Sequence, residues 1–157
     1  MIKIKGLTFS YGDNAPVISG LDLNIEAGEF VTILGPSGCG KSTLLRIISH
    51  LERCEEGAFY VGPGEDRIRM MFQDYALFPW RTCVENVILG MNNLEISLKE
   101  KKELAQSWLE TLELGGHEHK YPKELSGGMM QRAALAQALS ANAELILMDE
   151  PFGALDN

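Results

Sequence analysis

The spacing of hydrophobic residues near the start of the chain predicts strands. Apolar residues occupy positions 2 and 4, and after Gly6 they occupy positions 7, 9 and 11. A glycine at such a change of parity is typical of a bulge or bend in a strand. Residues 21–25 alternate apolar and polar side chains without a break, which predicts a half-buried antiparallel strand.

Residues 30–34 form a different kind of run, because nearly every position is apolar. This composition is typical of a strand that is buried on both faces of a parallel sheet. A glycine-rich loop follows, and apolar residues at helical spacing then predict a helix over residues 41–51. A second apolar run at residues 145–148 predicts another buried strand, and shorter strands are expected near residues 58–61 and 68–72.

Two helices are expected in the second half of the chain. Ser97 and Glu100 have the spacing of a capping box, in which each side chain satisfies a free backbone amide at the helix start. The helix that follows carries an apolar stripe, interpreted as core packing, at Leu104, Ala105, Trp108, Leu109 and Leu112. A further helix is expected over residues 126–139. The order of elements predicts an α/β protein with an antiparallel N-terminal piece and a helical insert around residues 75–125.

The composition of the 157 residues narrows the classes of function. Hydrophobic residues make up 45% and charged residues 23%, which is typical of one soluble globular domain. The formal net charge is −8, and no basic cluster exceeds Lys101-Lys102, so nucleic acid is disfavoured as the main partner. No apolar run approaches the roughly 20 residues that span a bilayer. The first five residues lack the apolar block of a signal peptide, so the protein is expected to stay where it is made.

The three cysteines, Cys39, Cys54 and Cys83, are odd in number and show no C-x-x-C spacing. This usage fits a reducing cytosol and argues against a disulfide framework or a zinc site. His117 and His119 lie close together in the sequence, and a metal site there is conceivable. We prefer a polar surface loop, because no further ligands sit nearby in the sequence.

Residues 35–42 read Gly-Pro-Ser-Gly-Cys-Gly-Lys-Ser and match the phosphate-binding pattern G-x-x-x-x-G-K-[ST]. The glycines let backbone amides converge on phosphate oxygens at the positive end of the following helix. Lys41 is expected to neutralise charge on the β- and γ-phosphates, and the Ser42 hydroxyl is expected to ligate Mg²⁺. The place of the motif between a buried strand and a helix argues against a chance glycine-rich turn. By itself the motif predicts a P-loop nucleoside triphosphatase.

Two carboxylates, Asp149 and Glu150, follow the apolar run at residues 145–148. The end of a buried strand would place Asp149 at the edge of the sheet near the P-loop, where it can hold Mg²⁺. Glu150 would then be within reach of a water that attacks the γ-phosphate, and it is the predicted general base. An acidic turn after a strand is the alternative, and the P-loop in the same chain favours the catalytic interpretation.

The sequence Leu125-Ser126-Gly127-Gly128 precedes the last predicted helix. Ser126 is expected to cap that helix while the two glycines leave their amides open, which makes a second anion site. In this motif, and in its place upstream of the Asp149-Glu150 strand, the sequence resembles the ABC ATPase family. An ordinary capped helix is the alternative, but it does not explain this order of motifs.

The resemblance implies a P-loop NTPase fold with a RecA-like parallel-sheet core in residues 1–75 and 140–157 and a helical subdomain in residues 76–139. It implies Mg-ATP as the ligand, hydrolysed between two domains, expected to be identical, that pair head to tail. Tyr11 would stack on adenine near Val17, and Gln73 would touch Mg²⁺ and the attacking water. The Ala-Leu-Asp sequence at 154–156 would contact the opposite subunit.

The motifs and the resemblance together give a complete set of candidate site residues. The predicted catalytic residues are Glu150, Lys41 and Gln73, and the predicted metal ligands are Ser42, Gln73 and Asp149. The predicted nucleotide contacts are Tyr11, Val17, Gly35, Pro36, Ser37, Gly38, Cys39, Gly40, Lys41, Ser42, Thr43, Gln73, Ser126, Gly127 and Gly128.

The sequence Phe78-Pro79-Trp80, followed by Glu85-Asn86-Val87, resembles the branch of the family that imports nitrate, sulfonate, taurine and related small solutes. This implies a peripheral ATPase on the cytoplasmic face of the membrane, with permease subunits as partners and a solute-binding protein as an indirect one. Met129 is familiar in this branch. Met130 departs from the family, where Lys or Arg is usual, and removes one charge near a phosphate site.

The family pattern continues past Asp156, through a helix and a strand to a histidine at the γ-phosphate. The strand would lie between the P-loop strand and the Asp149-Glu150 strand. We therefore expect a C-terminally truncated form that binds nucleotide weakly and turns over little ATP. Two alternatives stay open: a nucleotide-binding fragment without hydrolysis, and a soluble ABC ATPase without a membrane partner. The acidic balance and the short stretch between the P-loop and the signature disfavour the second.

Overall fold

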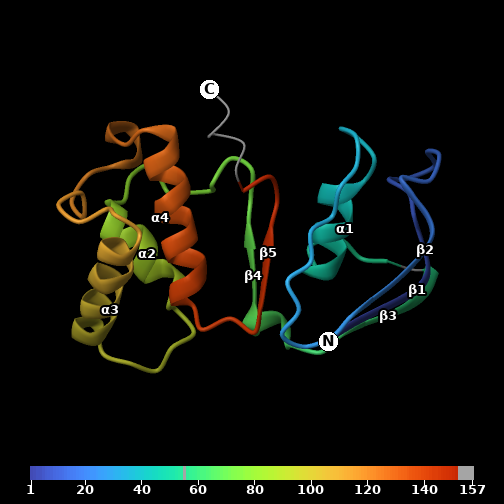
Figure 1. Ribbon diagram of the computed structural model, residues 1–157, viewed down its shortest axis with the longest axis horizontal. Helices are drawn as coiled ribbons and strands as arrows, with labels where there is room; N and C mark the ends of the chain where they lie inside the picture. The colour runs from blue at the N-terminus through green and yellow to red at the C-terminus, as the bar shows by residue number, and fades with distance from the viewer. Residues whose placement is uncertain (55, 152–157) are drawn as a thin grey trace. The chain divides into compact units, whose positions relative to one another are not determined.

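A computed structural model of the protein describes residues 1–54 and 56–151. The chain divides into two units, Met1–Glu65 and Asp66–Asn157. Each unit contains one of the two sheets, and helices follow or join its strands (Figure 1).

β1 (Ile2–Phe9) is the central strand of the first unit and contains the change of parity predicted from the sequence. It pairs antiparallel with β2 (Ile18–Ile25) on one side and with β3 (Glu56–Val61) on the other. The pairing with β2 shifts register between Ile4 and Leu7, and both of these side chains are buried. The bulge therefore keeps apolar side chains in the core on both sides of the shift, which confirms the prediction.

α1 (Lys41–Ile48) follows the glycine-rich loop and is shorter than the helix predicted over residues 41–51. Most of its apolar side chains are buried, as the helical spacing predicted. The helix ends early because His50 takes the left-handed backbone region, with a φ of 60°, which interrupts the helical hydrogen bonds. Leu51, beyond this break, is exposed and does not join the core.

The strand predicted over residues 30–34 is wrong, because this segment pairs with no strand among the described residues. Phe30 is 92% exposed and Leu34 is 86% exposed, so the run is not buried on two faces. An apolar run becomes a strand only where a neighbouring strand accepts its backbone amides and carbonyls as partners. The two described sheets offer no such neighbour, and the expected parallel core is limited in residues 1–54 and 56–151 to the second unit.

The second unit is built on two parallel strands, β4 (Ile68–Met71) and β5 (Leu145–Met148), close to the predicted positions. A 3-10 turn, η1 (Glu65–Arg67), leads into β4. Where the two strands begin, Arg67 and Glu144 form an ion pair of 3.0 Å. The Glu144 amide also donates to the Arg67 carbonyl at 2.9 Å, so the pairing of β4 with β5 is extended by one further contact at its start.

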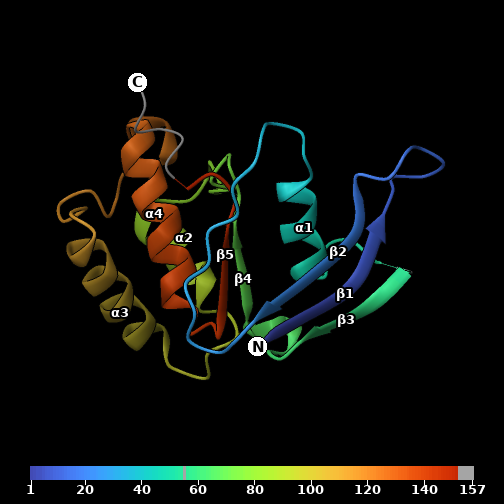
Figure 2. The same ribbon diagram turned by 45° about the vertical axis from the view of Figure 1, so that its right-hand side comes forward.

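Three helices pack beside this strand pair: α2 (Cys83–Gly90), α3 (Leu98–Thr111) and α4 (Gly127–Ser140). A 3-10 turn, η2 (Pro122–Glu124), precedes α4. α4 contacts β4 and also both other helices, and it lies between α3 and the strand pair (Figure 1 and Figure 2). The positions of α3 and α4 confirm the two predicted helices, whereas α2 was not predicted as a separate element.

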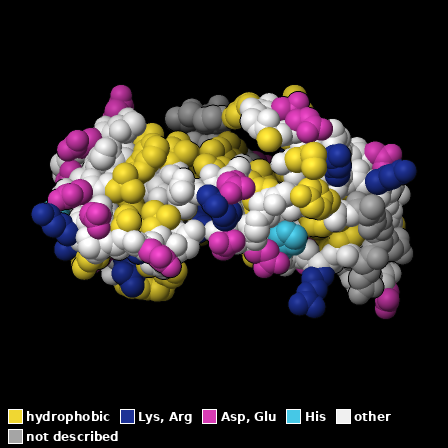
Figure 3. Space-filling model, turned by 90° about the horizontal axis from the view of Figure 1, so that it is seen from below, with side chains coloured by type: hydrophobic (Ala, Val, Ile, Leu, Met, Phe, Trp, Pro, Cys, Tyr) yellow, Lys and Arg dark blue, Asp and Glu magenta, His cyan; other side chains and the backbone are white. Residues whose placement is uncertain are grey.

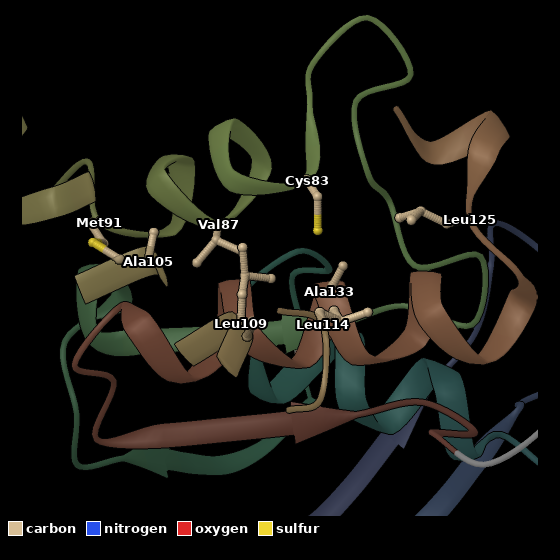
Figure 4. Close-up of a cluster of buried hydrophobic side chains, with 9 residues drawn as sticks. Cys83, Val87, Met91, Ala105, Leu109, Leu114, Leu125 and Ala133 are labelled. Atoms are coloured by element: carbon tan, nitrogen blue, oxygen red, sulfur yellow. The ribbon is translucent and has the colours of Figure 1, made fainter. Parts of the chain in front are cut away.

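Buried side chains of the three helices and their connections form one hydrophobic cluster (Figure 4). Its members are Cys83, Val87, Met91, Ala105, Leu109, Leu114, Leu125, Ala133 and Ala136. Burial raises the pKa of the Cys83 thiol to about 11, and the nearby Glu118 carboxylate adds to the shift. The thiol is therefore neutral and acts as a small apolar side chain.

Capping boxes begin both α2 and α3. Ser97 caps α3 and pairs with Glu100, as predicted, and Thr82 caps α2 and pairs with Glu85. The hydrogen bonds from the Ser97 side chain and amide lower the pKa of Glu100, and those from the Thr82 amide and hydroxyl lower the pKa of Glu85. Both carboxylates therefore support folding above the ordinary glutamate pKa, and this support is lost as the pH falls through their lowered values.

Asn86 is the buried polar residue that fixes the segment before α2. Its Oδ1 accepts from the Phe78 amide at 2.8 Å, and its Nδ2 donates to the carbonyls of Phe78, Arg81 and Thr82 at 3.0 to 3.2 Å. The side chain is fully buried. The segment from residue 78 to residue 82 is therefore tied to the first turns of α2.

We expect Asn86→Ala to destabilise the protein by about 2 kcal/mol, because it leaves buried backbone groups without partners. Urea unfolding followed by circular dichroism would measure the change. Asn93→Ala is the matched control, because Asn93 is exposed and its Nδ2 donates a hydrogen bond of 3.2 Å to the Asp66 carbonyl. A loss for Asn86→Ala no larger than that of the control would contradict the anchoring role.

Candidate functional site

The glycine-rich loop before α1 contains two glycines in the left-handed backbone region. Gly38 and Gly40 take positive φ values of 78° and 96°, which side-chain-bearing residues rarely adopt. A Cβ on Gly40 would also lie 3.1 Å from the Val17 carbonyl. Gly40 is the N-cap residue of α1, and no side chain caps this helix. The amides of its first turn can therefore bind an anion, and the loop fits a nucleotide phosphate.

Lys41 turns back onto the loop that precedes it. Its Nζ donates to the carbonyls of Gly35 and Pro36, both at 2.9 Å, and lies 4.0 Å from the Cys39 sulfur. A Cβ on Gly35 would lie 2.7 Å from that sulfur, so the loop packs against its own cysteine. The ammonium group is thus held among the residues that the sequence pattern assigns to phosphate binding.

Tyr11 and Val17 lie against the same loop and helix within the first unit. The Tyr11 hydroxyl is 3.3 Å from the Thr43 hydroxyl, and the Tyr11 ring packs edge-on against Phe9 with centroids 5.0 Å apart. Val17 lies next to Gly40, since a Cβ on Gly40 would be 3.1 Å from the Val17 carbonyl oxygen. The predicted nucleotide contacts from residue 11 to residue 43 therefore form one group, although the Tyr11–Thr43 contact could not be read from the spacing of the two residues.

A second group follows the ends of β4 and β5. The Asp149 amide donates to the Met71 carbonyl at 3.0 Å, and Asp149 is buried. Gln73 Nε2 donates to Glu150 Oε2 at 2.8 Å, and both of these residues are exposed. The structure thus brings together three predicted site residues from distant parts of the sequence, and it adds a direct Gln73–Glu150 contact that the sequence analysis missed.

The signature segment begins α4 in the manner predicted. Ser126 is the N-cap, and its hydroxyl accepts from the Met129 amide at 3.3 Å. Met129 and Met130 pack against the hydrophobic cluster of the helices, which accounts for an apolar side chain at position 130. Arg132, farther along α4, forms a 3.0 Å ion pair with Glu113. A basic side chain thus remains on this helix despite the methionine at position 130.

The chemistry of the predicted metal ligands fits Mg²⁺. Ser42, Gln73 and Asp149 offer hydroxyl, amide and carboxylate oxygens, which are the ligands of a hard cation. No group of three or more His, Cys, Asp or Glu residues capable of holding a metal ion occurs in residues 1–54 and 56–151. The predicted Ala-Leu-Asp contact at 154–156 lies outside the described residues.

The surface carries charges of both signs. Acidic and basic side chains are interspersed on the face shown in Figure 3. Trp80, which is 69% exposed, stands beside Phe78 with ring centroids 5.1 Å apart, on the segment that Asn86 anchors. None of the helices in the described part of the chain is both long and apolar enough to cross a membrane.

Comparisons with known proteins identify relatives along nearly the whole chain. The family model described as ABC transporter matches residues 18–153. The aliphatic sulfonates import ATP-binding protein SsuB of Bacillus cereus is 45% identical over 89% of the chain, which covers 57% of that protein. The Fe(3+) ions import ATP-binding protein FbpC of Fusobacterium nucleatum is 42% identical over 99% of the chain, which covers 44% of it. The chain thus spans about half the length of these two curated relatives.

A solved structure with the same fold is a dimeric ATP-binding cassette in a post-hydrolysis state with ADP and Pi bound. It matches with a TM-score of 0.86 and 35% sequence identity, over 100% of this chain and 77% of that one. This similarity confirms the predicted fold class, a P-loop NTPase of the ABC type.

Proposed function

The chain belongs to the ABC transporter family, and from this premise we propose that it is the nucleotide-binding part of an ATPase that drives solute import. The observation that carries the proposal is the loop at residues 35–42. Its glycines take positive φ values, the N-terminus of α1 has no side-chain cap, and a lysine ammonium lies among the loop carbonyls. These features suit the triphosphate of ATP.

The proposed roles follow the chemistry of each side chain. The loop amides and Lys41 bind the β- and γ-phosphates, while Tyr11 stacks on the adenine and Val17 lies beside it. Ser42, Gln73 and Asp149 hold Mg²⁺, which when bound neutralises phosphate charge. In hydrolysis, the oxygen of a water bonds to the γ-phosphorus, the bond to the β–γ bridging oxygen breaks to release ADP, and Glu150 accepts the proton of the water.

We propose that Ser126, Gly127 and Gly128 serve the site of a second copy, in a head-to-tail dimer. The start of α4 supports this role, because Ser126 caps the helix and Gly127 and Gly128 lie in its first turn, where backbone amides can bind an anion. The dimeric cassette among the similar structures supports the pairing. In this arrangement the chain works at the cytoplasmic face of a membrane with permease subunits, and a solute-binding protein delivers the solute.

For the solute, we propose a small molecule of the nitrate, sulfonate or taurine kind. The support is the Phe78-Pro79-Trp80 segment and the relative named for sulfonate import, at 45% identity. A relative named for Fe(3+) import is 42% identical, so nucleotide-binding residues alone do not separate these solutes. Co-purification with a sulfonate permease supports the proposal, whereas association with ribosomes or DNA would favour the soluble ABC ATPase.

The nucleotide site is tested by Lys41→Met, with Mg-ATP affinity measured by isothermal titration calorimetry. We expect affinity to fall about 10- to 100-fold, because charge-assisted hydrogen bonds to the phosphates are lost. Lys102→Met, on the exposed surface of α3, is the matched control and should bind as the parent chain does. Equal affinity in the Lys41 and Lys102 variants would refute the site. Binding without turnover by the parent chain would favour the hydrolysis-deficient alternative.

A further inference from the structure

The register of β4 and β5 places Gln73 opposite Glu150. The two strands pair without a shift, so that each residue of β4 faces the residue 77 positions later on β5. The Asp149 amide continues the pairing beyond the strands by donating to the Met71 carbonyl at 3.0 Å. Gln73 and Glu150 have the same separation of 77 and are joined side chain to side chain at 2.8 Å. The contact is thus a direct consequence of strand pairing.

Both chain segments turn immediately after this contact. Glu150 itself has a φ of 49°, and Tyr75 and Ala76 have φ values of 62° and 48°. These left-handed conformations are unfavourable for residues with side chains, so surrounding contacts must maintain them. The Tyr75 amide donates to the Phe72 carbonyl at 3.0 Å, which closes the turn that carries Gln73. The amide side chain and the carboxylate therefore face each other from two turns whose shapes are fixed by their backbones.

We propose that Gln73 is a positioning residue for Glu150, holding its carboxylate through Nε2 so that one defined oxygen serves as the base. This inference rests on the proposed function, in which Glu150 accepts the proton of the attacking water. Gln73 takes Oε2, which leaves Oε1 of Glu150 to accept that proton. The carbonyl oxygen of Gln73, on the other branch of the same amide, would be the proposed ligand of Mg²⁺. A shift of the turn at residues 73–76 would therefore move the base as well as the metal ligand.

Two substitutions separate the donor role from a role as metal ligand alone. Q73E keeps a side-chain oxygen for Mg²⁺ but replaces the donor with a second carboxylate that repels Glu150. Q73M removes both polar groups without adding charge. If Gln73 positions Glu150, Q73E should be the slower of the two variants. If Gln73 acts only on Mg²⁺, Q73E should be the faster. The matched controls are Q106E and Q106M, on the exposed surface of α3.

Steady-state ATP hydrolysis by the full chain gives the first readout. We expect kcat to fall about 10- to 100-fold in Q73E and less in Q73M, with the KM for ATP within about twofold of the parent value in both. The Gln106 variants should match the parent chain. Equal or faster turnover by Q73E than by Q73M would overturn the proposal, as would a change confined to KM.

A double-mutant cycle in thermal stability tests the contact without any need for turnover. Q73E should lower the melting temperature by about 2 °C, and the swapped pair Q73E/E150Q should recover it, because the amide and the carboxylate have exchanged places. If the melting-temperature shifts of Q73E and E150Q simply add in the double variant, the two side chains are not coupled and the proposal is wrong. If the parent chain hydrolyses no ATP, the proposed hydrolysis fails, while this cycle still decides whether Gln73 holds Glu150.

Discussion

Gly90→Ala is expected to destabilise the protein by about 3 kcal/mol, although alanine is the better helix former by about 1 kcal/mol. Gly90 is the last residue of α2. A Cβ at this position would lie 2.2 Å from the Gln137 carbonyl oxygen and 3.0 Å from the Ser140 hydroxyl, both on α4. The carbonyl belongs to a helix backbone and cannot yield by rotating a side chain. The two helices must therefore move apart.

Moving α2 away from α4 would also stretch the hydrogen bonds that join them. Gln137 Nε2 donates to the Asn86 carbonyl at 2.8 Å, and the Ser140 hydroxyl donates to the Val87 carbonyl at 3.2 Å. Both acceptors lie on α2 within four residues of Gly90. The substitution should therefore create a steric clash and weaken these two hydrogen bonds at the same time. The loss is thus expected to exceed that of simple overpacking at a flexible contact.

Urea unfolding followed by circular dichroism and tryptophan fluorescence would measure this loss, since Trp108 packs against the hydrophobic cluster of the helices. Gly115→Ala is the matched control. A Cβ there meets only Glu110 Cγ, at an ordinary 3.8 Å, among atoms of the described residues. The control should change stability by less than about 1 kcal/mol. An unfolding midpoint for Gly90→Ala at or above that of the parent chain would show that α2 and α4 are not closely packed at Gly90.

Elements set by local signals were predictable from the sequence. The alternation of apolar residues and its parity change gave β1, because the bulge arises within one strand. The Ser97–Glu100 spacing gave the start of α3, since a capping box needs only its own four residues. α2 was missed although Thr82 and Glu85 have the same spacing. That signal, followed by apolar residues, could have identified the helix.

Elements that depend on a distant partner were predicted less well. The run at residues 30–34 was expected to be a strand on composition alone, but pairing decides whether such a run forms a strand. The two strands of the second unit were predicted close to their observed positions, and each has the other as its neighbour. The expectation that residues 145–148 are buried holds for Leu147, whereas the rest of β5 is half-buried. The predicted division into a sheet part and a helical part at residues 75–76 and 139–140 stays a prediction.

The candidate site shows the same distinction. The P-loop is one continuous segment of the sequence, and so is the cap at Ser126. Each has the local geometry expected of it. The contacts of Tyr11 with Thr43 and of Gln73 with Glu150 join residues 32 and 77 positions apart. No periodicity in the sequence encodes them: the first depends on how α1 packs beside the segment after β1, and the second on the register of β4 and β5. The position of Gln73 next to the predicted base therefore became visible only with the pairing of β4 and β5.

Glu150→Gln is expected to abolish most ATP turnover while leaving nucleotide binding intact. The amide has the same shape as the carboxylate but cannot take a proton from the attacking water, and loss of a general base lowers rates by about 10²- to 10⁴-fold. Binding should persist because the phosphate contacts proposed for residues 35–42 lie on the loop before α1. Single-turnover hydrolysis and calorimetry with Mg-ATP would measure the two effects separately.

Glu110→Gln is the matched control for this prediction. Glu110 is exposed on α3, and the substitution makes the same chemical change away from the site. It should hydrolyse ATP at the rate of the parent chain. If Glu150→Gln loses less than about tenfold in rate, another group accepts the proton, and Asp149 becomes the next carboxylate to test. If the variant instead loses ATP affinity, Glu150 contributes to binding the nucleotide, and its assignment as a base that acts only in the chemical step is wrong.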